Sequence, residues 1–373
     1  MPRSPHRRHP RLVGFARGVG GPTLSGMAAP SQRAIRAAIE QLCASGPVDT
    51  RDFRAVVLAT LRRTVDFDWY VWVLTDPASE VGVDPLAVVP DLTALPELVR
   101  LKYGTRLNRW TGPVVAAALG DRRDDSPLWV RAQSSHGVAD VVSVVFRDGF
   151  GCWAFLDLWC RDRVPDDAVR LLGELAPALT TALRRRQAGC FAEPAGLLPG
   201  ASDAAVLLLD RELRIVGRTP TSQAWLALLL PPGDRPDPVP AAALNIAAQL
   251  IAREDGADDH PAVGRVHLAA GFWLTMKAAR VTPGDLIAVT MEASSPADRL
   301  DLFARCHGLS RREQELLDEL ARGASTREIA DRMFLSEHTV QDHLKSIFGK
   351  TGAHARRTLL SRALGVRTDV GPA

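Results

Sequence analysis

The strongest constraint on the fold is a succession of three helix starts near the end of the chain, between Ser310 and Ser336. In a capping box, a serine oxygen and a glutamate three residues later satisfy the free amides at a helix N-terminus. Ser310 with Glu313 has this pattern, Ser325 with Glu328 repeats it, and Ser336 is the next N-cap candidate. Starts this close together predict short, consecutive helices.

Each of these predicted helices has an apolar face at helical spacing. The faces consist of Leu316, Leu317 and Leu320, then Ile329, Ala330 and Met333, then Val340, Leu344 and Ile347. Gly323 suits the end of the first helix, because glycine tolerates left-handed geometry. The second and third helices are joined through Phe334 and Leu335, which predicts a helix-turn-helix.

The third helix leaves Thr339, Gln341, Asp342 and Lys345 on or beside its open face. A helix of this kind fits the major groove of B-form DNA, where base edges display distinguishable donors and acceptors. The net charge of the chain is only +3, but residues 343–367 contain six lysines and arginines and no acid. Because cations that meet phosphates release counterions, this segment predicts binding to double-stranded DNA.

This part of the chain resembles the LuxR-type helix-turn-helix family, which also occurs on many response regulators. The matching residues are Leu309, Ser310, Arg311, Arg312, Glu313, Gly323, Ser325, Glu328, Ile329, Ala330, Leu335, Ser336, Thr339, Val340, His343, Ile347, Lys350, Gly352 and Arg356. The resemblance covers roughly the last fifth of the chain. It implies that the third helix enters the major groove, and that a last helix, Ala355 to Leu364, supports it and often dimerises.

The resemblance also implies a set of residues at the DNA. These are Ser336, Thr339, Val340, Gln341, Asp342, His343, Lys345, Lys350 and Arg356. Many relatives have a lysine where this chain has Gln341, and an apolar residue where it has Thr351, so the base preference does not carry over. Gln341 suits a bidentate contact with adenine, whereas Asp342 would repel phosphate and could only accept from cytosine.

The upstream sequence predicts two α+β sensor domains. In the first, two helical patterns precede β-rich stretches at 68–74, 141–146 and 152–158, and a long helix covers 167–185. In the second, the predicted elements are a hairpin over 204–210 and 213–218, helices over 221–230 and 241–253, and strands over 264–269, 272–281 and 285–292. Their element orders resemble those of GAF-like and PAS-like antiparallel-sheet domains.

The predicted organisation is therefore multidomain α+β. It comprises a disordered basic leader at 1–30, a GAF-like domain at 31–190, a linker at 191–201, a PAS-like domain at 202–293 and an all-α four-helix LuxR-type domain at 298–368. Met27 is an alternative start for the protein. The expected product is a signal-responsive bacterial transcription regulator that binds DNA as a homodimer on two half-sites.

Several classes of site are not expected. The five cysteines show no C-x-x-C pair and no zinc spacing with histidines, so we expect reduced, mostly buried thiols and no metal or cofactor. No catalytic set is apparent, and the protein is not expected to be an enzyme. Gly349-Lys350-Thr351 imitates the end of a phosphate-binding loop, but Leu344 stands where its first glycine belongs. Without a membrane span or signal peptide, the expected location is the cytoplasm.

Two alternatives stay open at this level. Six of the eight tryptophans and both tyrosines lie in the first sensor domain, where they either fill the core or line a pocket for an unknown small molecule. If they line a pocket, the front half is a ligand carrier, or an enzyme, with a DNA-binding tail. Alternatively, the helix-turn-helix tail serves protein interaction, which Asp342 on the recognition face would favour.

Overall fold

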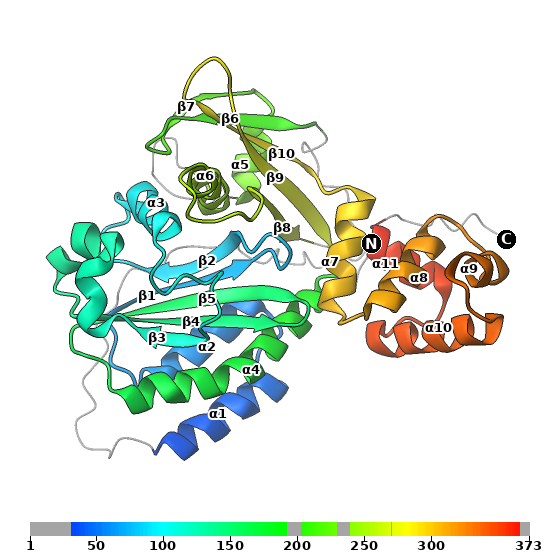
Figure 1. Ribbon diagram of the computed structural model, residues 1–373, viewed down its shortest axis with the longest axis horizontal. Coiled ribbons are helices and arrows are strands. Elements are labelled where there is room, and N and C mark those ends of the chain that lie inside the picture. The colour runs from blue at the N-terminus through cyan, green and yellow to red at the C-terminus, as the bar shows by residue number, and fades with distance from the viewer. Residues whose placement is uncertain (1–30, 192–202, 230–238, 270, 366–373) are drawn as a thin grey trace, which may run out of the picture.

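The computed structural model describes residues 31–191, 203–229, 239–269 and 271–365. Two five-stranded antiparallel sheets are followed by a helical C-terminal part (Figure 1). The fold class is therefore mixed α+β, as predicted. The leader predicted at 1–30 and the linker from residue 192 onward lie outside the described residues.

The first sheet contains the aromatic-rich strands of the predicted GAF-like region. In spatial order its strands are β2 (Gly82–Val88), β1 (Trp69–Thr75), β5 (Gly151–Cys160), β4 (Asp140–Asp148) and β3 (Ala116–Ala118). Trp72 and Trp153 are fully buried, and Trp159 is nearly so. Most of these rings fill the core, because each buries a large apolar area.

Helices cover both faces of the first sheet (Figure 1). One face packs against α1 (Gln32–Ser45), α2 (Thr50–Leu61) and α4 (Asp166–Gly189). The apolar residues Ile35 and Ile39 of α1 lie one helical turn apart and are both fully buried in this layer. The other face carries α3 (Leu95–Gly104), and three short helical turns at 120–125, 129–133 and 134–136 connect β3 to β4.

The second sheet has the same strand order when its strands are counted from its own first strand. Its strands are β7 (Ile215–Arg218), β6 (Ala205–Leu209), β10 (Ile287–Ala293), β9 (Phe272–Arg280) and β8 (Val263–Ala269). The predicted hairpin and the three predicted closing strands are confirmed, with ends shifted by a few residues. Two helices, α5 (Ser222–Leu229) and α6 (Ala241–Glu254), lie between β7 and β8 along the chain.

Helix α6 lies between the two sheets (Figure 1). Ala243, Ile246 and Ala247 of α6 are fully buried in one hydrophobic cluster with Val73 and Phe155 of the first sheet. The cluster continues into the second sheet. Because the second face of the first sheet is apolar and needs cover, the two sheet-containing units share a core instead of forming separate globules.

The C-terminal part consists of helices in the described residues. They are α7 (Pro296–Cys306), α8 (Arg311–Ala321), α9 (Thr326–Met333), α10 (Glu337–Thr351) and α11 (Arg356–Leu364). The last four correspond to the predicted helix-turn-helix domain. Helix α7 is one more than the four predicted over 298–368, and it connects this domain to the sheets.

An aromatic cluster joins the three parts of the molecule. Phe191 stacks on Trp273 of β9 with ring centroids 5.1 Å apart, and meets Phe303 of α7 edge-on at 5.4 Å. Phe191 is the first residue of the linker predicted at 191–201, and its side chain is buried. A single aromatic residue after a helix carries no periodicity that could have revealed this packing.

Two bulk properties follow from the described part of the chain. All five cysteines lie in it and are free thiols, and Cys152, Cys160 and Cys306 are buried. Among the same residues, no helix combines the length and the apolar content needed to cross a bilayer.

Candidate nucleic-acid interface

Both predicted capping boxes are formed. The Ser310 hydroxyl accepts from the backbone N–H of Glu313, while the Glu313 carboxylate accepts from the N–H of Ser310. Ser325 and Glu328 repeat the arrangement at the start of α9. Since both helix starts are fixed by contacts three residues apart, the local sequence positions α8 and α9.

Glu313 also ties α8 to α10. Its carboxylate accepts from Ser346 Oγ and from Lys350 Nζ, each at 2.6 Å, although the residue is only 3% exposed. Burial alone would raise the pKa of Glu313, but the hydrogen bonds from Lys350, Ser346 and Ser310 outweigh it and lower the pKa to about 2. The ionised carboxylate therefore holds α10 against the N-terminus of α8.

The turn between α9 and α10 is short. Phe334 ends α9 in the left-handed conformation, with φ 56° and ψ 46°. The N–H of Leu335 then returns to the carbonyl oxygen of Ala330 at 2.9 Å, and Ser336 caps α10 by accepting from the N–H of Thr339. This closure sets the angle between the two helices of the helix-turn-helix.

Helix α10 has one anchored face and one open face. Val340, Leu344 and Ile347 are buried in the core of the domain. The opposite face presents the exposed side chains of His338, Gln341, Asp342 and Lys345. A regular helix with an apolar anchor therefore displays four polar groups within two turns.

The open face of α10 contains its own charge pairing. Asp342 lies 3.2 Å from Lys345 Nζ and 3.6 Å from His338 Nε2, and all three side chains are more than half exposed. Ion pairs as exposed as these contribute little to stability, so the side chains can separate when another partner arrives. The repulsion between Asp342 and phosphate is therefore reduced by its neighbours.

Two residues of the predicted DNA-contact set also serve the fold of the domain. Val340 is fully buried, so its side chain belongs to the core and cannot reach DNA. Lys350 forms an ion pair with the buried Glu313, while 38% of its own side chain stays exposed. The resemblance marked both positions, but a shared motif residue can serve the fold as well as the ligand.

The remaining predicted residues surround the open face of α10. Ser336 and Thr339 join their hydroxyls at 2.9 Å, and His343 is half-buried. Arg356 at the start of α11 donates to Thr326 Oγ1 of α9. Thr351, the departure from the family pattern, is buried, and its hydroxyl donates to the carbonyl oxygen of Ile347 at 2.8 Å.

The prediction omitted His338. Its side chain is 84% exposed and lies on the same face as Gln341 and Lys345. The spacing 338, 341, 342, 345 is the ordinary three-and-four pattern of a helix face, so the signal was present in the sequence. An exposed histidine at the first turn adds a donor to the polar face.

Helix α7 connects this domain to both sheets. Arg265 of β8 donates to the carbonyl oxygen of Asp298 and to Asp301, both on α7, at 2.8 Å. Arg299 of α7 donates to the carbonyl oxygens of Gly271 and Arg362. The position of the helix-turn-helix domain therefore depends on side chains from the second sheet.

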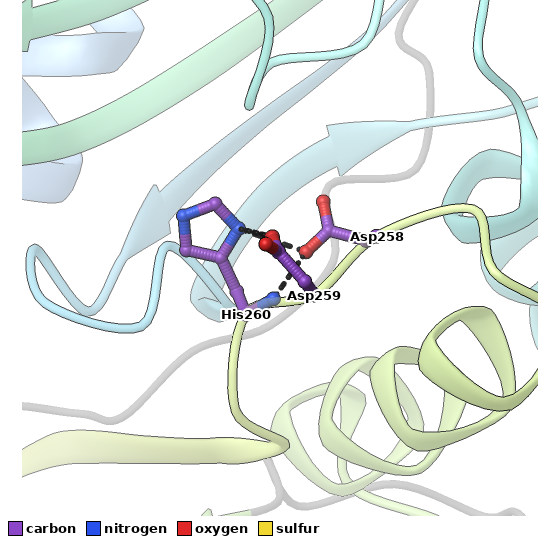
Figure 2. A group of neighbouring side chains, drawn as sticks. All are labelled: Asp258, Asp259 and His260. Atoms are coloured by element: carbon purple, nitrogen blue, oxygen red, sulfur yellow. Dashed lines mark hydrogen bonds and ion pairs between the residues drawn. The ribbon is translucent and has the colours of Figure 1, made fainter.

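A second polar cluster lies at the boundary of the two sheet-containing units. Figure 2 shows His260 turned toward Asp258, with Nδ1 and the carboxylate 2.8 Å apart, and Asp259 beside them. Asp258 also accepts from Arg109 Nε and Thr111 Oγ1 of the first unit, each at 2.8 Å. Because donors occupy both oxygens of Asp258, the cluster is an inter-unit hydrogen-bond network, and it offers no ready set of metal ligands.

An apolar cleft lies between the first sheet and α3. Its walls include Val73, Val99 and Phe155, and its polar lining includes Lys102 and Asp157, which form an ion pair at 2.7 Å. The cleft has a free volume of about 60 Å³. A single water needs roughly 10–15 Å³, so a molecule larger than a few waters would have to displace α3.

Residues 307–363 match the GerE family, described as bacterial regulatory proteins of the luxR family. Over 57 residues, the chain is 47% identical to the probable HTH-type transcriptional regulator GfsR of Streptomyces halstedii, which is 15% of this chain and 24% of that protein. Over 55 residues it is 44% identical to the CsgBAC operon transcriptional regulatory protein of Escherichia coli, covering 15% and 26%. The chain thus spans about a quarter of the length of these relatives.

The comparison with solved structures gives a weaker match. A crystal structure of Escherichia coli SdiA aligns with 90% of this chain and 98% of the SdiA chain, at 14% identity and a TM-score of 0.33. A score this low does not establish a common fold.

The capped helices, the turn at Phe334 and the sequence match together show that the C-terminal part of this chain is a helix-turn-helix domain of the luxR family of bacterial regulatory proteins.

Proposed function

We propose that the protein is a DNA-binding transcriptional regulator that reads duplex DNA with α10. One observation carries the proposal: His338, Gln341, Asp342 and Lys345 are exposed together on a helix whose other face is fixed in the core. The luxR match over 307–363 supports it. A regulator needs this combination, because a base-reading helix must be rigid and accessible at once.

The open face of α10 offers distinct contacts. Gln341 can bond an adenine edge twice, accepting with its amide oxygen and donating with its amide nitrogen, and Asp342 can accept from a cytosine. Lys345 is placed for a phosphate or a guanine. Ser336, Thr339, His343 and Arg356 are proposed to flank these contacts, whereas Val340 and Lys350 are assigned to the structure of the domain.

The front half is proposed to be the sensor, with a GAF-like unit at 31–190 and a PAS-like unit at 202–293. Both sheets have the strand order second, first, fifth, fourth, third, which supports two related units. Because Arg265 and the aromatic cluster connect these units to α7, a change in them would move the helix-turn-helix domain. The protein would act in the cytoplasm as a homodimer on two half-sites.

The signal is proposed to be a small, largely apolar molecule that displaces α3 as it binds in the cleft, because the free volume there is only about 60 Å³. The apolar walls with one buried ion pair favour such a ligand over a charged one. Val99→Trp would fill the cleft. DNA affinity of the wild-type protein should then change when a small-molecule cell extract is added, while affinity of the variant should not, and equal responses would refute the cleft as the sensor.

The main experiment selects duplexes from a random DNA pool with the full chain. The matched protein is a Gln341→Ala, Lys345→Ala double variant, whose changes are exposed and should leave the unfolding midpoint unaltered. We expect one enriched motif, preferably a pseudo-palindrome, with the wild-type protein and none with the variant. Failure to enrich a motif, with and without cell extract, would overturn the proposal.

The second candidate is a partner-binding module whose helix-turn-helix tail contacts another protein. Asp342 favours it, since a carboxylate on the open face is unusual for a surface that meets phosphates. Under this reading the selection recovers no motif. Pull-downs with wild-type protein should then recover a partner that the Gln341→Ala, Lys345→Ala variant loses.

A further inference from the structure

Phe334 combines two features that set it apart from the rest of the described chain. Its side chain is 95% exposed, and its backbone is left-handed with φ 56°. Among the described residues, the other non-glycine residues with positive φ are Glu80, Asn108 and Leu213, and none of them is exposed. Leu213, for comparison, is fully buried.

The neighbouring helices show what this position ordinarily requires. The turn after α8 has Gly323 at φ 85°, and α10 and α11 end at Gly352 and Gly365 with φ 64° and 70°. The turns after α8 and α9 even close in the same way, since the N–H of Ala324 returns to Glu319 as that of Leu335 returns to Ala330. Phe334 therefore occupies a place where glycine would be unstrained.

No contact within the described chain accounts for this ring. An exposed phenyl group gains nothing from burial in the free protein, and a left-handed residue other than glycine is strained. Phe334 lies two residues before Ser336, the N-cap of α10. In a helix-turn-helix, the start of the recognition helix lies in the major groove, so the turn before it lies where the sugar-phosphate backbone borders the groove.

We propose that Phe334 is a DNA-contact residue whose ring packs on the deoxyribose groups of the backbone beside the recognition helix. The inference rests on the proposed function and adds a contact that is apolar and independent of base sequence. Such a contact positions the helix without specifying bases. The Phe334 ring would extend the open face of α10 across the turn.

The test measures affinity of the full chain for the selected motif and for an unrelated duplex. Phe334→Gly should weaken both by about three- to tenfold, as expected for losing part of one buried aromatic contact. The unfolding midpoint should not fall, because glycine relieves the left-handed strain. Phe334→Leu should retain more affinity than Phe334→Asn, which tolerates left-handed geometry but is polar.

Salt dependence separates this contact from an electrostatic one. The slope of log affinity against log salt should be the same for wild type and Phe334→Gly, while Lys345→Ala should lower it by about one. Val216→Thr, at an exposed valine on β7, is the matched control and should bind as wild type does.

The outcomes are distinct. If wild-type protein binds DNA and Phe334→Gly binds equally well, the contact is refuted and the proposed function stands. If Phe334→Asn and Phe334→Leu bind alike, the contact is not apolar and the inference is wrong. If wild-type protein binds no duplex, both the contact and the proposed function are overturned.

Discussion

Arg265 of β8 and Asp76, which lie 189 residues apart in the chain, form a two-armed ion pair buried between the two sheets. Arg265 Nε and Nη2 donate to the two oxygens of Asp76 at 2.6 and 2.7 Å, and the two residues are 7% and 2% exposed. The third nitrogen of the same guanidinium reaches Asp301 on α7. One side chain thus connects both sheet-containing units to α7, the helix that precedes the helix-turn-helix domain.

Asp76→Asn should destabilise the protein by about 3–5 kcal/mol, because it leaves the Arg265 guanidinium buried without its main counter-charge. The measurement is the free energy of unfolding in urea. Asp301→Asn is the matched control at the half-exposed end of the same guanidinium, and its loss should stay near 1 kcal/mol. Equal losses of unfolding free energy in the two variants would show that the ion pair with Asp76 contributes no more to stability than the pair with Asp301.

Lys345 and Lys350 should behave differently although both are lysines of α10. Lys345→Ala should lower the salt dependence of DNA binding by about one and leave the unfolding midpoint in place. Lys350→Ala should lower the midpoint, because it leaves the buried carboxylate of Glu313 without its ammonium partner. A salt slope that falls equally in both variants would place Lys350 at a phosphate.

Asp342→Asn should strengthen binding to unrelated duplexes by about two- to fivefold and steepen its salt dependence, because it removes a carboxylate near phosphates and releases Lys345. Affinities for a motif duplex and a scrambled duplex report the effect. A loss of the motif preference, in place of a general gain, would instead identify Asp342 as a reader of cytosine.

Acid should lower the stability of the protein through His307, the residue that ends α7. Burial lowers the pKa of His307 to about 4, whereas an unfolded imidazole titrates near pH 6.5. The folded state disfavours protonation of His307. The contribution of the neutral imidazole to the free energy of unfolding is therefore complete above about pH 6.5 and is lost as the pH falls toward 4. His307→Gln, which keeps a donor but takes no charge, should flatten the fall of the unfolding midpoint over that interval. His267 has a similarly lowered pKa and remains in both proteins, so parallel profiles would contradict the assignment to His307.

The sequence by itself determined the DNA-binding domain closely. Capping boxes, glycine stops and apolar spacings act within three or four residues, so α8 to α11 and the open face of α10 followed from local pattern. The strands of both sheets were likewise predicted, because β-branched and aromatic runs between turn residues are local signals. The family resemblance placed the same residues in the same order.

The tertiary structure decided how these pieces share surfaces. Local pattern gave no reason to pair Arg265 with Asp76, to bury Phe191 against Trp273 or to place α6 between two sheets. It also could not separate Lys350, held by Glu313, from Lys345, which is open. Contacts between residues far apart in sequence depend on how whole layers pack, and no period within one element records which distant side chain will complete it.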